Sequence, residues 1–105
     1  MDNFKIIYKI LKALEKSLDC EEIDIKEISS EALNISEQRW SRIIKMIVDN
    51  GYVEGIRIVS YDGARIPLIK FYNPTITLAG LEYLEENSLM KKAANIAKGI
   101  SDMIP

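Results

Sequence analysis

The connection Asn34–Ser36 restricts the fold most, because it separates two short segments that each carry their own helix start. Asp24 precedes the first segment and Ser36 precedes the second, and both side chains can accept hydrogen bonds from the backbone N–H groups of a first helical turn. Gly51 follows the second segment and suits the left-handed position that ends many helices. We therefore predict a helix-turn-helix motif. Its two helices are expected over residues 24–33 and 36–50.

A longer amphipathic helix is expected before this motif, over residues 2–19. Its apolar residues recur at helical spacing on one face, and lysines occupy the opposite face. The predicted apolar face consists of Phe4, Ile7, Leu11, Leu14 and Leu18. This face would pack against the helix-turn-helix motif.

After residue 51 the sequence changes to a strand pattern around the dipeptide Asp62-Gly63. This dipeptide suits a type I′ turn, because both central residues of that turn need positive φ. A two-residue turn would pair Val59 with Ile66, while Pro67, which has no N–H to donate, should lie at an edge or a bulge. The core face of the predicted hairpin consists of Ile56, Ile58, Ile69 and Phe71.

Two further helical stretches are predicted after the hairpin. Thr77 is positioned as the N-cap of a helix that ends near Glu86, and a second stretch follows from Ser88. The apolar residues on one side of the second stretch are Leu89, Ala93, Ile96, Ala97 and Ile100. They would either close over the first helix or form the seam of a homodimer, and the sequence supports both alternatives equally.

The expected fold class is thus α+β, a winged helix-turn-helix with three N-terminal helices, a β-hairpin wing and C-terminal helices. From the length we expect one domain over residues 1–105, with 88–105 as a C-terminal helical extension. The chain contains neither an apolar run of about 20 residues, which a membrane-spanning helix needs, nor a signal-peptide pattern. We therefore expect a cytoplasmic protein that does not enter a membrane.

Enzymatic activity is not expected from this composition. The sequence contains no histidine and a single cysteine, Cys20. Histidine is the commonest general base and metal ligand, and a lone cysteine provides neither an internal disulfide nor a zinc cluster. We therefore expect no catalytic residues, no metal and no cofactor, and a function that consists of binding a partner.

The distribution of arginine favours double-stranded DNA as that partner. All four arginines lie in the predicted third helix or in the wing, whereas the basic residues elsewhere are lysines. Arginine can contact guanine edges and phosphates through two parallel hydrogen bonds. Residues 36–70 hold six basic and four acidic residues, although the whole chain has a net charge of −2. The candidate DNA-binding residues are Gln38, Arg39, Arg42, Lys45, Arg57, Arg65 and Lys70.

A protein-interaction role without DNA binding is the alternative hypothesis. The sequence pI of about 5.2 is well below that of a typical DNA-binding domain, and a fold of this kind does not dictate its function. The wing face turned away from the core carries an apolar patch, which would be covered by the terminal helices or used for a protein partner. The candidate partner-binding residues are Val59, Tyr61, Ile66 and Leu68.

Three stretches of the chain resemble the YjcQ family of small bacterial and phage proteins. They are MDNFKIIYKILKALEKS at the start, ISSEALNISEQRWSRIIKMIVDNGYVEGI in the centre and ITLAGLEYLEENSLMKKA towards the end. The resemblance covers nearly the whole chain. It implies a winged-helix fold and a prophage setting. The placement of the arginines on this fold favours a DNA-binding phage or prophage transcriptional regulator. The resemblance implies no particular catalytic or binding residue.

Overall fold

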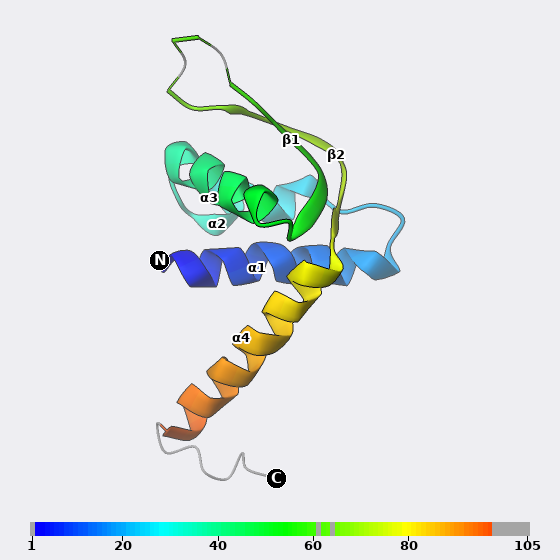
Figure 1. Cartoon of the computed structure of the whole chain (residues 1–105), viewed down its shortest axis with the longest axis vertical. Coiled ribbons are helices and arrows are strands. Elements are labelled where there is room, and N and C mark those ends of the chain that lie inside the picture. Colours follow the sequence, from blue (N-terminus) through cyan, green and yellow to red (C-terminus); the bar gives the residue numbers. More distant parts are fainter. Residues whose placement is uncertain (1, 61, 64, 98–105) are drawn as a thin grey trace.

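The computed structural model describes residues 2–60, 62–63 and 65–97, with side chains up to residue 87. The elements are α1 (Asn3–Lys16), the 3₁₀ turns η1 (Ser17–Asp19) and η2 (Ile25–Ile28), α2 (Ser30–Leu33), α3 (Glu37–Asp49), the strands β1 (Val53–Val59) and β2 (Leu68–Ile76), and α4 (Leu78–Ala97). Figure 1 shows α1 between α3 and α4, with the antiparallel hairpin curved over α3. The predicted α+β class and winged helix-turn-helix order are confirmed.

Helix α3 begins and ends as the sequence predicts. The Ser36 side chain accepts a hydrogen bond from the backbone N–H of Arg39 at 3.1 Å, and Gly51 follows the helix with a φ of 74°. Asn34 ends α2 in the left-handed conformation, with a φ of 56°. The three-residue connection between the two helices of the motif is therefore confirmed.

The helix predicted over residues 24–33 is interrupted at Ser29. Asp24 caps it as expected, accepting from the backbone N–H of Lys26 at 3.1 Å. Ser29 is extended, and its hydroxyl donates to the Lys26 carbonyl while accepting from the N–H of Ala32. Such local side-chain bonds compete with a continuous helix. The prediction of one helix is wrong here, because Ser29 ends η2 and starts α2.

Helix α1 is shorter than predicted, and its buried face includes the predicted Leu11 and Leu14 but is rotated relative to the predicted face. Residues Ser17–Asp19 form η1 rather than a last α-helical turn. Phe4 and Leu18, predicted to point inward, are 67% and 54% exposed, whereas Ile6 and Ile10 are fully buried. Apolar residues occur on more than one side of this helix, so their spacing alone does not determine the buried face. The contacts of α1 with α3, η2, β2 and α4 determine it instead.

The hairpin has the predicted faces but a different register. Arg57 lies opposite Lys70 and Val59 opposite Leu68, two positions away from the register that a two-residue turn would impose. The chain turns at Asp62-Gly63 as predicted, but the predicted pairing of Val59 with Ile66 is wrong. The connection spans residues 60–67 and contains the turn at Asp62-Gly63, and Pro67 has no N–H with which to extend the ladder. Because a shift of two positions preserves the face, the four predicted core residues of the hairpin still pack inward.

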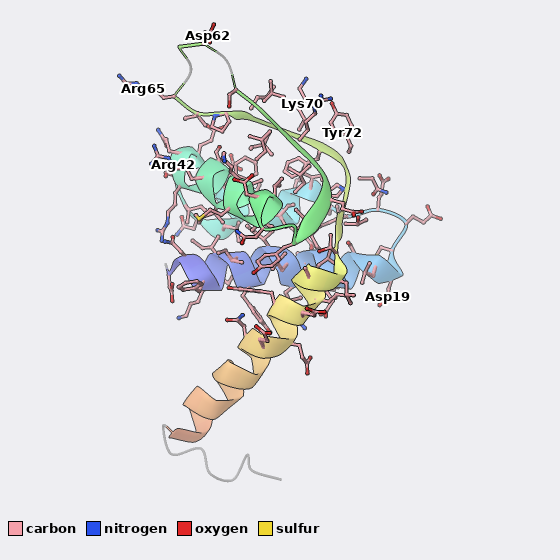
Figure 2. All side chains as sticks on the ribbon, viewed as in Figure 1. Asp19, Arg42, Asp62, Arg65, Lys70 and Tyr72 are labelled. Atoms are coloured by element: carbon pink, nitrogen blue, oxygen red, sulfur yellow. The ribbon has the colours of Figure 1, made fainter. Side chains whose placement is uncertain are left out.

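A β-bulge bends the hairpin near its base. The ladder shifts between the pairs Glu54–Thr75 and Ile56–Phe71, and Gly55 has a φ of 78° at this point. A Cβ atom on Gly55 would lie 2.6 Å from the carbonyl oxygen of Tyr72, so only glycine allows the strands to approach this closely. The bend directs the hairpin back over α3 (Figures 1 and 2).

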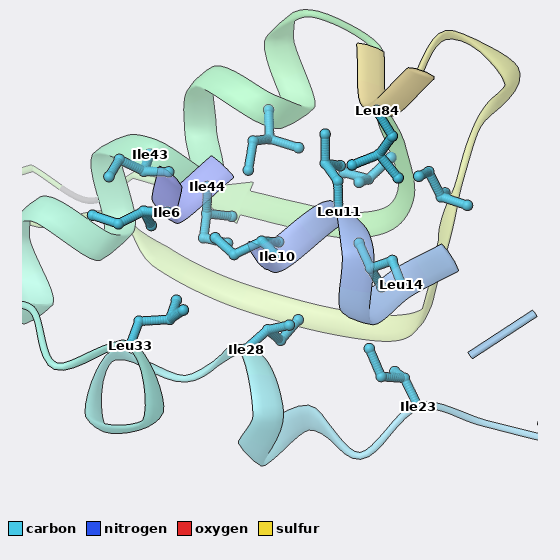
Figure 3. Close-up of a cluster of buried hydrophobic side chains, with 13 residues drawn as sticks. Ile6, Ile10, Leu11, Leu14, Ile23, Ile28, Leu33, Ile43, Ile44 and Leu84 are labelled. Atoms are coloured by element: carbon cyan, nitrogen blue, oxygen red, sulfur yellow. The ribbon is translucent and has the colours of Figure 1, made fainter. Parts of the chain in front are cut away.

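One apolar cluster lies among α1, α3, the η2–α2 segment, the base of the hairpin and α4 (Figure 3). Its most buried members come mainly from α1 and α3. The cluster consists of Ile6, Ile10, Leu11, Leu14, Ile23, Ile28, Leu33, Ile43, Ile44, Ile47, Val53, Ile76 and Leu84. The hairpin residues Ile56, Ile58, Ile69 and Phe71 are partly buried and extend the cluster upward over α3.

Helix α4 is a single element, although the sequence predicts a break near Glu86. The helix continues through Asn87 and Ser88 to Ala97. Helix propensity is a weak determinant, and two residues of modest propensity do not end a helix that lacks a stop signal. The prediction of several C-terminal helices is therefore wrong within the described residues. The apolar face predicted over residues 89–100 concerns side chains outside the described residues.

Thr77 joins the start of α4 to the end of α3. Its hydroxyl donates to the Gly51 carbonyl at 2.6 Å and accepts from the N–H of Gly80 at 3.2 Å, which confirms the predicted N-cap. Its backbone N–H donates to the Tyr52 carbonyl at 3.0 Å. A Cβ atom on Gly80 would collide with that same carbonyl oxygen and would lie 2.6 Å from Cγ1 of Ile76. Gly80 is therefore required for α4 to approach the Gly51–Tyr52 turn.

The first prediction concerns this close approach. Gly80→Ala should lower the free energy of unfolding by about 1 to 3 kcal/mol, because the added methyl meets backbone that cannot move freely. Helix propensity alone predicts a gain of about 1 kcal/mol, so the two effects have opposite signs. Urea denaturation measures the difference, with the exposed neighbour Ala79→Gly as the control for propensity. A stabilised Gly80→Ala variant would contradict the proposed packing.

Trp40 connects α3 with the hairpin and with η2. Its indole N–H donates to the Ile28 carbonyl at 2.7 Å, and its ring centroid lies 6.1 Å from that of Phe71 on β2. The side chain is half-buried. Trp40 therefore fixes the distance between the second helix of the motif and the wing above it.

Two replacements of Trp40 distinguish the contribution of its ring packing from that of its hydrogen bond. Trp40→Ala should cost about 3 kcal/mol of stability, because both the ring packing and the hydrogen bond are lost. Trp40→Phe keeps an aromatic ring but leaves the Ile28 carbonyl without this donor, so it should cost about 1 kcal/mol. Chemical denaturation followed by circular dichroism distinguishes these values. Equal stability of Trp40→Ala and the parent would show that the indole does not contribute to the packing.

Candidate nucleic-acid interface

Helix α3 divides into a buried face and an exposed basic face. Ile43, Ile44 and Ile47 are almost fully buried against α1 and the hairpin. The exposed residues of α3 are Glu37, Gln38, Arg42, Lys45, Met46 and Asp49. Three of the candidate DNA-binding residues, Gln38, Arg42 and Lys45, are thus exposed, and Ser41 is a buried residue that apolar spacing alone does not reveal.

Arg42 lies near the middle of the exposed face (Figure 2). Its neighbour along that face, Lys45, forms an ion pair with Asp49 at 2.6 Å, in which both side chains remain about half exposed. An exposed pair of this kind contributes little stability and opens easily. Lys45 can therefore leave the Asp49 carboxylate and bind another anion, such as a phosphate.

Arg39 has a different environment from the other arginines. Its guanidinium donates two hydrogen bonds to the side-chain oxygen of Asn3, from Nε at 2.9 Å and from a terminal nitrogen at 2.6 Å. This interaction joins the first turn of α3 to the first turn of α1. Arg39 thus positions the exposed face of α3, a role for which the sequence contains no recognisable signal because Asn3 is 36 residues away.

The structure divides the predicted basic residues of the wing between two surfaces. Arg65 is exposed near the tip of the hairpin, on the same side as Arg42 in Figure 2. Arg57 and Lys70 are exposed on the face of the hairpin that points away from α3. Arg57 and Lys70 are direct cross-strand partners. The predicted register would instead place Arg57 opposite Leu68 and make Lys70 its diagonal neighbour. Only Arg65 therefore accompanies the α3 residues.

The candidate partner-binding residues occupy the hairpin and its connection. Leu68 is 39% exposed, and Val59 and Ile66 are half-buried. Tyr61 lies outside the described residues. Tyr72 was not predicted, although it continues the two-residue alternation from Leu68 and is 58% exposed. The face opposite the core thus combines apolar, basic and aromatic side chains.

Other kinds of site receive little support from the described residues. Within the described ranges, no three histidine, cysteine, aspartate or glutamate side chains are grouped so that they could hold a metal ion. None of the helices in those ranges has the length and apolar character required to cross a bilayer. A pocket of about 120 Å³ lies between residues 17–23 and 73–75, far below the usual volume of roughly 300 to 1,000 Å³ for a small-molecule site.

The family model described as YjcQ protein matches residues 8–103 of the chain. Comparison with curated proteins gives no match, and comparison with solved structures gives none either.

The different roles of Arg39 and Arg42 can be tested through stability. Arg39→Ala should lower the free energy of unfolding by about 1 kcal/mol, because it removes two charge-assisted hydrogen bonds between α1 and α3. Arg42→Ala changes an exposed side chain and should stay within about 0.5 kcal/mol of the parent. Thermal and urea denaturation of the matched variants provide the comparison. A larger loss for Arg42→Ala than for Arg39→Ala would reverse the assignment.

Proposed function

This chain belongs to the YjcQ family, and we propose that it binds double-stranded DNA through the exposed face of α3 and the tip of the hairpin. The proposal treats the protein as a binding protein without catalytic activity. The absence of histidine, the commonest general base, from the sequence supports the view of the chain as a binding protein.

The observation that carries the proposal is the position of Arg42. It projects from the middle of a helix whose opposite face is anchored by fully buried isoleucines. The ion pairs among the described residues are Lys12–Glu15 and Lys45–Asp49, so no acidic side chain there neutralises Arg42. A rigid helix with an available guanidinium has the geometry that reads base edges in a major groove.

The side chains around Arg42 suit complementary tasks in such a complex. Gln38 can form two hydrogen bonds with the major-groove edge of adenine, and Arg42 can form two with guanine. Lys45 and Arg65 are placed to contact phosphates on either side of the groove. Base contacts would thus come from α3, and the wing tip would fix the orientation of the domain on the duplex.

The net charge of the chain limits this binding to a local surface. A chain with a net charge of −2 has weak attraction for DNA of arbitrary sequence. Specific contacts must therefore supply much of the affinity, and few counterions should be released on binding. We expect a shallow dependence of log K on log salt, compared with a strongly basic DNA-binding domain.

The test selects bound duplexes from a random pool at low salt and then titrates variants against the selected site. Arg42→Ala should weaken specific binding by about 1 to 3 kcal/mol and broaden the base preference at one position. Arg57→Ala also removes an arginine side chain, but from the face of the hairpin that points away from α3. It is the matched control and should leave DNA affinity unchanged.

Arg65→Ala tests the wing tip separately. It should weaken binding to all sequences alike and reduce the salt slope by about one unit, because it removes one phosphate contact. Failure of the parent protein to enrich any sequence, together with an Arg42→Ala variant that binds duplex DNA as the parent does, would refute the proposed function.

A further inference from the structure

The hairpin carries a second basic surface that the proposed DNA contact does not use. Arg57 and Lys70 lie directly opposite each other in the ladder, and Val59 and Leu68 form the next pair on the same face. Tyr72 follows two residues after Lys70 and points away from α3, as Lys70 does (Figure 2). We refer to these five residues as the outer hairpin face.

The two cations of this face lack an acidic partner. Like charges directly opposite each other destabilise a pair of strands. Neither Arg57 nor Lys70 forms an ion pair with an acidic side chain in the part of the chain that the structure describes. An anionic surface placed against them would remove this repulsion and add charge-assisted hydrogen bonds.

The apolar residues of the outer hairpin face indicate what kind of anionic surface fits against it. Leu68 is 39% exposed on one side of the basic pair, and Tyr72 is 58% exposed on the other. A phosphate backbone would contact the cations but would leave the aliphatic side chains without apolar partners. A protein surface that combines carboxylates with an apolar side chain provides partners for both the cations and the apolar residues.

Helix α4 presents this complementary pattern. Leu78, Glu82 and Glu85 are all exposed, and their spacing of four and three residues places them on one stripe of the helix. Leu78 is 72% exposed, the largest exposure among the exposed large apolar residues that the structure describes. We refer to these three residues as the acidic α4 stripe.

The spacing of the two patterns is compatible. Along the helix, Glu82 lies about 6 Å from Leu78, at 1.5 Å per residue. Along the strand, Lys70 lies about 7 Å from Leu68, at 3.3 to 3.4 Å per residue. The hairpin and α4 lie on opposite sides of α1 (Figure 1), so the two surfaces cannot meet within one molecule.

We propose that the outer hairpin face of one copy of the chain binds the acidic α4 stripe of a second copy. In this contact the two glutamates pair with Arg57 and Lys70, and Leu78 packs on Leu68. The contact does not involve the exposed face of α3. It is therefore independent of the proposed DNA binding, and a copy bound to DNA can still associate with another.

The test exchanges the charges of the two surfaces. Sedimentation equilibrium of the parent, at up to about 1 mM because exposed contacts of this size are weak, should give an average mass above the monomer mass of 12.0 kDa. Arg57→Glu/Lys70→Glu should reduce the association constant at least tenfold, and Glu82→Lys/Glu85→Lys should do the same, because each places like charges together. An equimolar mixture of the two double variants should recover association, because each surface then meets its opposite.

Two controls keep the result specific. Lys16→Glu/Lys26→Glu lowers the net charge by as much as Arg57→Glu/Lys70→Glu does, at exposed positions outside both surfaces, and should retain association. Thermal unfolding checks that each variant folds, and Glu82→Gln/Glu85→Gln, a milder change, should weaken self-association less than Glu82→Lys/Glu85→Lys does. A parent that remains monomeric throughout the concentration range, or a mixture that fails to recover, overturns the proposal. A uniform loss of DNA affinity in Arg57→Ala would assign this basic pair to DNA instead.

Discussion

The hydrogen bonds of Thr77 hold together the two halves of this structure. Its hydroxyl and its backbone N–H bind the carbonyls of Gly51 and Tyr52, so the end of α3 and the start of α4 are fixed to each other. The hairpin leaves and returns between these two points, and its last ladder pair lies directly beside them. This junction holds the base of the wing, and the contact of Trp40 with Phe71 holds the part that lies over α3. The missing side chain of Gly80 is what allows the approach.

Helix α3 connects stability with the proposed function. One face supplies isoleucines to the apolar cluster and Trp40 to the hairpin and η2, and the other face presents Gln38 and Arg42 to solvent. A helix held by so many contacts keeps its exposed side chains in a fixed arrangement, which lowers the entropy cost of binding a rigid duplex. Arg39 adds to this rigidity through Asn3, so residues of one chemical type serve two purposes on one helix.

The sequence-based predictions are accurate where the interactions join residues close together along the chain. The caps at Asp24, Ser36 and Thr77 were predicted correctly, because a cap depends on residues within one helical turn. The exposed positions of Gln38, Arg42 and Lys45 were also predicted, since α3 has a strong apolar stripe on one side. The register of the hairpin was not, because the turn dipeptide Asp62-Gly63 is compatible with a longer connection and Pro67 prevents the ladder from extending to it.

The sequence by itself determined the order of the elements, the helix-turn-helix spacing and the two faces of the hairpin, because local hydrogen bonds and residue periodicity depend on near neighbours along the chain. Only the tertiary structure decided that α1 buries Ile6 and Ile10 rather than Phe4 and Leu18. It also decided how Arg39 is held and how the basic residues of the wing divide between two surfaces. Those features depend on groups that are distant in sequence, such as Asn3 beneath Arg39 and Lys70 beside Arg57. The spacing of side chains within one element does not predict which other element that element will contact. The packing of the whole chain determines those contacts.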